Sequence, residues 1–268
     1  MVEHPVLFND EMMRAILAGL KTQTRRPIKP QPEPYAGGVH PKNKAKHPAP
    51  YIDAYCGEPK TAQNPRRMSD RWYWWTEDDR LGPEVGRCPF GIPGDTLWVR
   101  ESWRVWSWGE DFDLGIETRD GKRHWIDKRS WEDEDRMYDW EERMWTQSSD
   151  DCKKGGMVYD ENAESYAWPD GREWNPPTRW RPSIRMPRWA SRLDLTVKRV
   201  WVERFDEISN ADIVAEGIEG YENDSHGMRS EIFGQFMTRW DAIYYAKRGL
   251  GWDANPWVWA CEWEVVEE

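Results

Sequence analysis

Apolar residues near the N-terminus recur at helical spacing, at Met12, Met13, Ile16 and Leu17. Asn9 is placed to cap this helix, and Gly19 stands where helices commonly end in a left-handed residue. Pro27 prevents any further helix. The pattern predicts a short amphipathic helix followed by a polar segment, residues 19–26, that is rich in cations and hydroxyl groups.

Alternating apolar residues predict strands at 71–75, 96–103, 193–202 and 257–266, of which 193–202 is the clearest. Two more helices are expected. The first spans 210–216, with Ser209 as its cap and Gly217 as its end. The second spans 231–247 and carries one apolar face: Ile232, Phe236, Trp240, Ile243 and Tyr244.

Strands separated by Gly- and Pro-rich turns, with helices between them, predict a mainly β member of the α+β class. We expect a small β-barrel with flanking helices. A doubly wound sheet is excluded because strands and helices do not alternate strictly. The Pro- and Lys-rich segment 27–70 is predicted to be an extended arm, and 104–175 an acidic, Trp-rich insertion in a single domain spanning 1–268.

Composition adds a charge asymmetry to this picture. The chain has 268 residues, 21 of them Trp, and a net charge of −11. The insertion 104–175 holds 20 acidic and 11 basic residues, whereas 21–71 holds 11 basic and 4 acidic, and 176–204 holds 8 basic and 2 acidic. The whole chain is therefore unsuited to coating nucleic acid non-specifically, but its basic segments suit an anionic partner.

No run of about 18 apolar residues is present, and no basic-then-apolar signal pattern opens the chain. We therefore expect a cytoplasmic protein that does not associate with membranes. The cysteines are scattered, with no CxxC pair, and are expected to be free thiols. The histidines show no metal-ligand spacing, so neither a metal nor another cofactor is expected.

Segment 178–192 interleaves arginines with tryptophans. Arg neutralises phosphate and Trp stacks on bases, so Trp180, Arg185, Arg188 and Trp189 are candidate nucleic-acid contacts. The alternative is that these arginines extend over a Trp core. Glu101 is expected at the surface, paired with a neighbouring arginine, Arg100 or Arg104.

Two hydroxyls interleaved with three cations in 19–26 either complement the end of the first helix or hold an anionic or polar substrate. Five residues fit a pattern, G-x-K-T-x-T-x-R: Gly19, Lys21, Thr22, Thr24 and Arg26. This segment resembles the end of the first helix in ASCH domains, which belong to the PUA-like β-barrel superfamily. The Gly94-Asp95 turn, the acidic helix 210–217 and the last strand are similar in order.

The resemblance covers about 1–30, 88–104 and 180–268, and leaves out both the arm and the insertion. Segment 91–103 is also similar to a G-x-P-G-D-x-L-W-V-R-E-x-W segment of phage- and prophage-encoded ASCH-like proteins. For a phage-encoded chain, the expected location is the host cytoplasm.

Some small ASCH proteins are amidohydrolases that remove the acyl group from N4-acetylcytidine with a lysine, a threonine and a glutamate. Carried over by position, the resemblance implies Lys21, Thr24 and Glu216 as catalytic residues. Thr24 would be the nucleophile once a base takes its proton. Lys21 would be that base if desolvation lowers its pKa, or would otherwise orient the substrate or stabilise an oxyanion. Glu216 would pass a proton to the leaving amine.

Three functions remain open at this point. The leading hypothesis is a nucleoside- or RNA-directed PUA-like protein that hydrolyses the amide of an acylated cytidine. The second is a non-catalytic protein that binds RNA or modified bases, in which Arg25 and Arg26 contact phosphate and Trp180 or Trp189 stacks. The third is a phage protein that binds or blocks a host factor through its acidic insertion, against the alternative that the insertion's tryptophans form a small core of their own.

Overall fold

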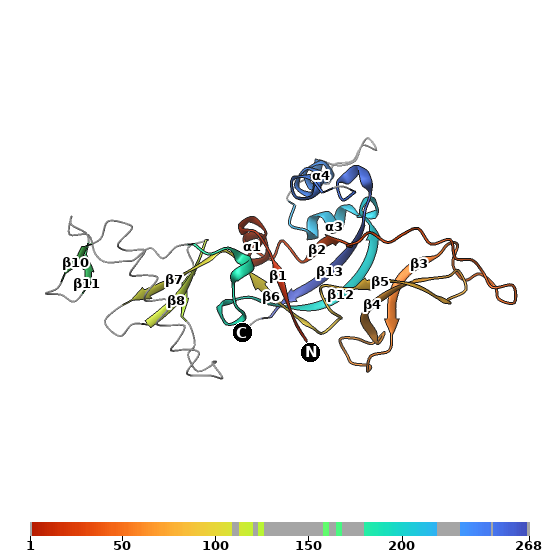
Figure 1. Cartoon of the computed structure of the whole chain (residues 1–268), viewed down its shortest axis with the longest axis horizontal. Helices are drawn as coiled ribbons and strands as arrows, with labels where there is room; N and C mark the ends of the chain where they lie inside the picture. Colours follow the sequence, from red (N-terminus) through yellow and green to blue (C-terminus); the bar gives the residue numbers. More distant parts are fainter. Residues whose placement is uncertain are drawn as a thin grey trace. The chain divides into compact units, whose positions relative to one another are not determined.

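The computed structural model describes residues 2–108, 113–119, 123–125, 158–160, 165–167, 180–218, 231–247 and 249–266. The protein is mixed α+β and consists mainly of strands with a few short helices, as Figure 1 shows. The predicted class is therefore confirmed. The chain divides into two compact units, one formed by Met1–Val6, Met12–Trp98 and Leu193–Glu268, the other by Leu7–Glu11 and Val99–Arg192.

A five-stranded sheet organises the first unit, in the order β1-β6-β12-β13-β2. Its strands are β1 (Glu3–Leu7), β6 (Thr96–Arg100), β12 (Asp194–Arg204), β13 (Trp257–Val265) and β2 (Gln23–Pro27). β12 and β13 pair antiparallel along most of their length. Leu195 and Val197 of β12 are buried on one face, whereas four consecutive residues of β13, 258–261, are buried, so that strand is covered on both faces. The two strands predicted most clearly from sequence are thus the centre of the sheet.

β2 is a strand that the sequence pattern did not predict. Helix α1 (Asp10–Leu17) is followed by Gly19, whose φ of 71° turns the chain. Segment 23–27 then pairs antiparallel with β13 at the edge of the sheet. Pro27 is tolerated because an edge strand need not donate every backbone hydrogen bond.

A three-stranded sheet, β3 (Tyr51–Cys56), β4 (Met68–Trp75) and β5 (Leu81–Arg87), packs against the five-stranded sheet. Trp72 meets Trp259 edge-to-face at 5.4 Å, and Trp74 meets Trp257 at 5.6 Å. These pairs bury large apolar areas in a chain that is poor in aliphatic residues.

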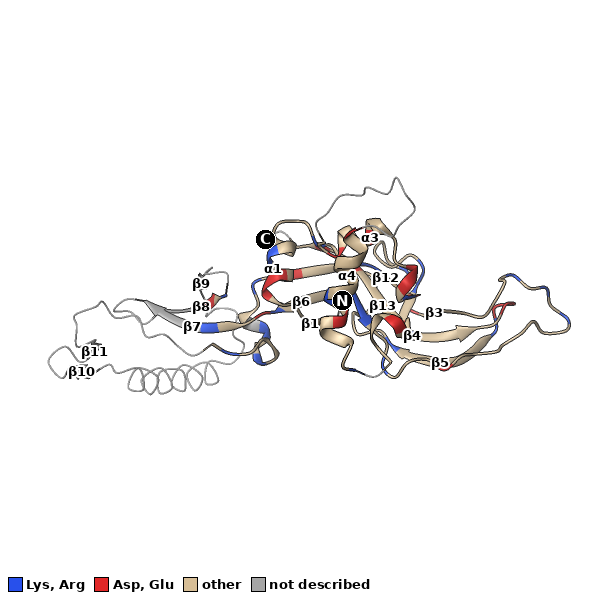
Figure 2. Cartoon of the chain, turned by 90° about the horizontal axis from the view of Figure 1, so that it is seen from above, with Lys and Arg blue, Asp and Glu red and all other residues tan. Residues whose placement is uncertain are grey.

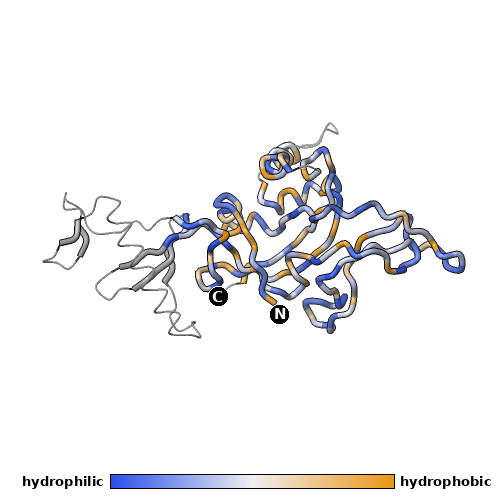
Figure 3. Tube along the Cα trace, viewed as in Figure 1, coloured by the Kyte–Doolittle hydropathy of each residue, from blue (hydrophilic) through white to orange (hydrophobic). Residues whose placement is uncertain are grey.

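The prediction of an extended arm over 27–70 is wrong for β3 and the start of β4. Residues 40–47, by contrast, form a hydrophilic loop, blue in Figure 3.

Helices α3 (Asn210–Ala215) and α4 (Glu231–Tyr244) enclose an apolar cluster with the ends of β12 and β13. As predicted, Ser209 caps α3 by accepting the Asp212 backbone N–H. The predicted apolar face of α4 needs one correction. Ile243 is 40% exposed, whereas Phe233 is buried and belongs to the apolar cluster.

Short 3₁₀ helices connect these elements at Ser183–Arg185, Arg188–Ala190, Phe205–Glu207 and Trp252–Ala254. In the second unit, β7 (Trp103–Trp108), β8 (Asp113–Thr118) and β9 (Arg123–Trp125) form an antiparallel sheet, and β10 (Val158–Asp160) pairs with β11 (Ser165–Ala167). Most of the predicted insertion 104–175 lies outside the described residues, so its proposed binding to a host factor rests on sequence alone.

The described strands form four sheets, and no closed barrel is found among them. The PUA-like barrel therefore stays a prediction. In the part of the chain that the structure describes, no helix is long and apolar enough to cross a membrane.

Candidate functional site

Lys21 and Glu216 form a buried ion pair where β2 approaches the end of α3. The Lys21 ammonium donates to the Glu216 carboxylate at 2.5 Å, to the Glu216 carbonyl at 3.0 Å and to the Gln23 carbonyl at 2.8 Å. Only 1% of the Lys21 side chain and 7% of the Glu216 side chain are exposed. Three acceptors surround a group that has three protons, so a charged Lys21 is fully satisfied by the protein.

The local backbone explains why these two residues meet. Glu216 ends α3, and a backbone bridge joins it to Lys21. The Thr22 backbone N–H donates to the Ala215 carbonyl at 2.8 Å, which extends the contact. Gly217 follows with a φ of 82°, the left-handed conformation that ends a helix.

Arg25 connects Glu216 to two further carboxylates. Its Nε donates to Glu203 at 2.6 Å and its Nη1 lies 3.3 Å from Glu216, while its Nη2 is 3.7 Å from Asp212. The Arg25 side chain is fully buried. Glu216 therefore bridges two buried cations, one through each oxygen. Buried charges of this kind are stable only when they are paired as closely as this.

An aromatic ring lies beside this network. The Trp201 indole N–H donates to Glu203 at 2.7 Å. The guanidinium of Arg25 lies 5.6 Å from the Trp201 ring centre, and that of Arg199 lies 4.5 Å from it. Figure 2 shows basic (blue) and acidic (red) segments close together around β12 and β13.

The surroundings shift the protonation of two groups. Burial lowers the pKa of Lys21, and the nearby carboxylate of Glu216 opposes this by stabilising the charged ammonium. The pKa of Asp212 is also lowered: burial acts to raise it, but the hydrogen bond from Ser209 and the charge of Arg25 outweigh that effect. Burial thus makes the Lys21 ammonium a stronger acid than an exposed lysine, while the three acceptors around it stabilise its charge.

Thr24 lies in β2 and is 1% exposed. Successive strand residues face opposite sides, so Thr24 faces away from Arg25 and shares its face with its cross-strand partner Cys261. The Lys21 ammonium lies 5.9 Å from the ring centre of Trp263, which is two residues from Cys261 and on the same face. Of the predicted catalytic trio, the structure brings Lys21 and Glu216 together, and Lys21 reaches towards the face that carries Thr24.

The predicted nucleic-acid contacts are spread over both units. In the first, Arg25 is buried and Arg26 is half-buried. In the second, the half-buried Trp180 ring lies against Arg104 and Arg119, at 4.8 and 5.2 Å, two arginines from outside segment 178–192. The remaining predicted contacts are Arg185, which is exposed, Arg188, which is half-buried, and Trp189, whose side chain is outside the described residues.

The expectation for Glu101 was wrong. Glu101 is 4% exposed, and both of its oxygens accept from Arg192, at 2.8 and 2.9 Å. The pair lies within the second unit and joins residues 91 positions apart. A bidentate guanidinium partner makes burial of this carboxylate tolerable, and local sequence gives no sign of it.

Sequence reasoning also missed Glu203, Asp212 and Trp201 as parts of the Arg25 network. Glu203 lies one position beyond the predicted end of its strand. Asp212 has the ordinary appearance of an acidic residue in the first turn of a helix. Arg25 itself gave no clue, because segment 23–27 was not predicted to be a buried strand, and only a buried arginine requires carboxylate partners.

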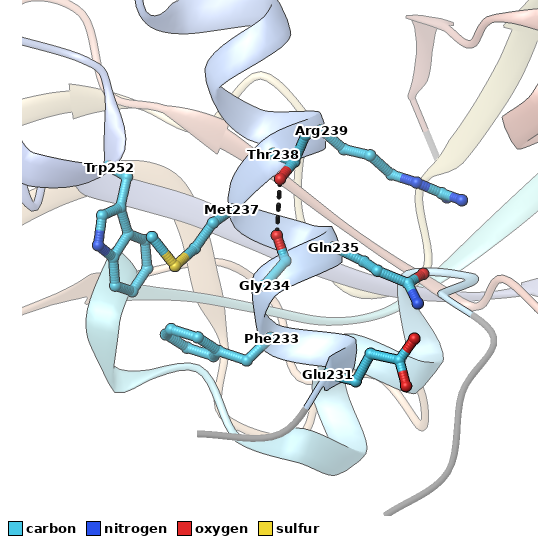
Figure 4. Close-up of a pocket in the computed structure, with 8 residues that line it drawn as sticks. All are labelled: Glu231, Phe233, Gly234, Gln235, Met237, Thr238, Arg239 and Trp252. Atoms are coloured by element: carbon cyan, nitrogen blue, oxygen red, sulfur yellow. Dashed lines mark hydrogen bonds between the residues drawn. The ribbon is translucent and has the colours of Figure 1, made fainter. Parts of the chain in front are cut away.

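Two cavities of the described part lie elsewhere. The first, about 880 Å³, opens beside α4 (Figure 4), with Phe233, Met237 and Trp252 on one side and Glu231, Gln235 and Arg239 on the other. The second, about 520 Å³, lies beside the chain that leaves β2. Neither is lined by Lys21, Thr24 or Glu216. Lys21 and Thr24 are each 1% exposed, so these two side chains are closed off from solvent in this structure.

No protein-family model, curated protein or solved structure matches this chain. The resemblance to ASCH domains therefore rests on the sequence motifs. Among the described residues, no cluster of His, Cys, Asp and Glu is arranged to hold a metal ion.

Proposed function

We propose that this chain is a PUA-like protein that hydrolyses the amide of an acylated, N4-acetyl-type cytidine. The observation that carries the proposal is the buried ion pair between Lys21 and Glu216, 2.5 Å apart, which joins two residues that the family resemblance assigns to catalysis. Burial lowers the pKa of Lys21, which favours the neutral amine that a general base must be.

In the proposed reaction, a proton moves from Lys21 to Glu216, which yields an amine and a carboxylic acid. The amine takes the hydroxyl proton of Thr24, and the threonine oxygen attacks the acyl carbon. The bond between that carbon and N4 breaks as Glu216 donates to the leaving amine the proton that it received from Lys21. Water then cleaves the threonine ester. Arg25 holds the second oxygen of Glu216 and so fixes the carboxyl group beside Lys21.

Because Lys21 and Thr24 are each 1% exposed, the acyl group reaches them only after the contact between β2 and the end of α3 opens. Binding energy from the rest of the substrate has to drive that opening. We therefore expect that a bare amide such as acetamide is not hydrolysed, even if acetylcytidine is.

The test measures release of cytidine from N4-acetylcytidine by chromatography. Thr24→Val keeps the volume and removes the hydroxyl, so turnover is abolished, whereas Thr24→Ser keeps the hydroxyl and retains activity. Glu216→Gln slows turnover by about 10²- to 10⁴-fold. A wild-type protein that leaves a panel of acylated cytidines intact refutes the hydrolase.

A second candidate function is binding of a modified base without catalysis. It is favoured by one observation: all three protons of a charged Lys21 are donated within the protein, at 2.5 to 3.0 Å. Such a lysine is structural. Titration of the same panel distinguishes the two functions, because a binding protein gives a saturable isotherm with no product, and Arg26→Ala weakens it.

A further inference from the structure

A groove of about 520 Å³ lies where the chain leaves β2, within the first unit. Three parts of the chain line it. The first is the segment after β2, with Ile28, Lys29, Pro30, Gln31, Pro32 and Pro34; the second is Arg204; the third comprises Gly249, Leu250, Ala254 and Trp257. Among these described lining residues, two are cations and none is an Asp or Glu. In a chain with 49 acidic and 38 basic residues, such a local excess of positive charge is notable.

The two cations of the groove, Lys29 and Arg204, have no carboxylate partner in the part of the chain that the structure describes. Elsewhere in the first unit, exposed cations such as Lys46, Arg66 and Arg87 are each paired with an aspartate, at 2.5 to 3.1 Å. Unpaired cations that converge on one groove indicate an anionic ligand.

The cation deeper in the groove is held in place. The Arg204 guanidinium lies 4.4 Å from the centre of the Trp257 ring, and its Nη1 donates to the Asn255 carbonyl at 2.9 Å. The carboxylate of Glu207 accepts from the Arg204 backbone N–H, at 2.9 Å, rather than from the guanidinium. Stacking and a single backbone bond leave other guanidinium N–H groups available for a phosphate.

The wall of the groove is also preformed. The Gln31 amide donates to the Ile28 and Trp257 carbonyls at 2.7 and 3.0 Å, and accepts the Trp257 backbone N–H at 2.7 Å. The prolines on this wall have no backbone N–H to offer. The charged donors of the groove are Lys29 and Arg204, which suit a ligand rich in acceptor oxygens.

The groove continues the strand that carries the candidate catalytic residues. The Ile28 backbone N–H donates to the Trp257 carbonyl at 3.0 Å, which extends the pairing of β2 with β13. Eight positions separate Lys21 from Lys29, and extended chain covers about 3.3 Å per residue, or roughly 26 Å in total. A free nucleoside is too short to occupy both places, whereas a nucleic-acid strand is long enough.

We infer that this groove binds the phosphodiester backbone of a single-stranded nucleic acid, with Lys29 and Arg204 as the phosphate contacts. The inference rests on the proposed function, because it identifies the substrate as a polymer that carries the modified base. Phosphate contacts position the strand and do not read its sequence.

The experiment measures fluorescence anisotropy of a dye-labelled, unmodified single-stranded RNA oligonucleotide against salt concentration. Lys29→Ala and Arg204→Ala are each expected to weaken binding several-fold and to reduce the salt slope by about 0.7, the value for one lost contact on a single strand. Lys198→Ala and Arg87→Ala are matched controls, because both side chains are exposed and paired with carboxylates. They are expected to leave affinity and slope unchanged.

The inference is overturned if the two groove variants bind like the controls, if wild type does not bind the oligonucleotide at low salt, or if cytidine monophosphate competes as well as the oligonucleotide. Since Arg204 also packs on Trp257, its variant is checked by thermal unfolding. Lys29→Glu, at an exposed position, provides the test independently of that packing.

Failure of this inference is distinguishable from failure of the proposed function. Binding that depends on the groove without any turnover refutes only the hydrolase. Turnover of free acetylcytidine by a protein whose oligonucleotide binding is independent of Lys29 and Arg204 refutes only the polymer substrate.

Discussion

The ammonium of Lys21 and the carboxylate of Glu216 lie 2.5 Å apart although 195 positions separate them in the chain. The contact joins the start of the edge strand β2 to the end of helix α3. Because both groups are buried, neither is stable there without the other or an equivalent partner. The pair is thus at once the candidate catalytic centre and a tie between two parts of the first unit.

Removal of Arg25 is expected to be strongly destabilising. Arg25→Met leaves Glu203 and Glu216 without their shared guanidinium, and we expect a loss of about 3–5 kcal/mol in the free energy of unfolding. Arg199→Met is the matched control: Arg199 is exposed and contacts the same Trp201 ring, so its removal costs about 1 kcal/mol or less. Urea unfolding measures both. Equal effects would show that the carboxylate network does not depend on Arg25.

Stability is expected to depend on pH through Lys21. Its pKa in the folded protein is lowered below 10.5, mainly by burial. Between the lowered value and 10.5, the unfolded chain binds more protons at this site than the folded chain, so the free energy of unfolding rises with pH. Lys21→Met removes that contribution and flattens the rise. Urea unfolding at a series of pH values up to 10.5 checks this, and a variant with the wild-type slope would contradict it.

Gly217→Ala is expected to disturb the site through its backbone. Gly217 has a φ of 82°, and an added Cβ would lie 3.0 Å from Ala15 Cβ and 3.1 Å from Lys21 Cβ. Gly249 has a similar φ of 77° with open space around it. The left-handed strain, about 1–2 kcal/mol, is common to both alanine variants, so Gly217→Ala should be the less stable. Thermal unfolding compares them, and equal melting temperatures would contradict the close packing against Lys21.

Thiol reactivity is expected to follow burial. Burial raises the pKa of Cys88 to about 12 and that of Cys261 well above 9, so few thiolates form at neutral pH. Cys56 is exposed. A maleimide at pH 8 should label Cys56 in the folded protein, and Cys88 and Cys261 only in denaturant, as peptide mass mapping will show. Labelling of Cys261 before unfolding would contradict the pairing of β13 with β2.

The sequence by itself determined the elements whose signals are local. The alternation around Leu195 and Val197 predicted β12, and Ser209 and Gly217 predicted both ends of α3. Such signals act within a few residues, because periodicity and caps depend on neighbouring backbone groups. The resemblance to ASCH domains, through a separate match in helix 210–217, implied that Glu216 belongs to the same site as Lys21.

Tertiary structure decided what depends on distant partners. Segment 23–27 has no alternation, and it is a strand because the edge of β13 offers backbone groups that must be satisfied. Glu101 is buried because Arg192 reaches it, and Arg25 is buried because Glu203 and Glu216 surround it. A buried charge requires an opposite charge nearby. Which charge is nearby depends on how the chain folds back on itself, and residues adjacent in sequence carry no record of that.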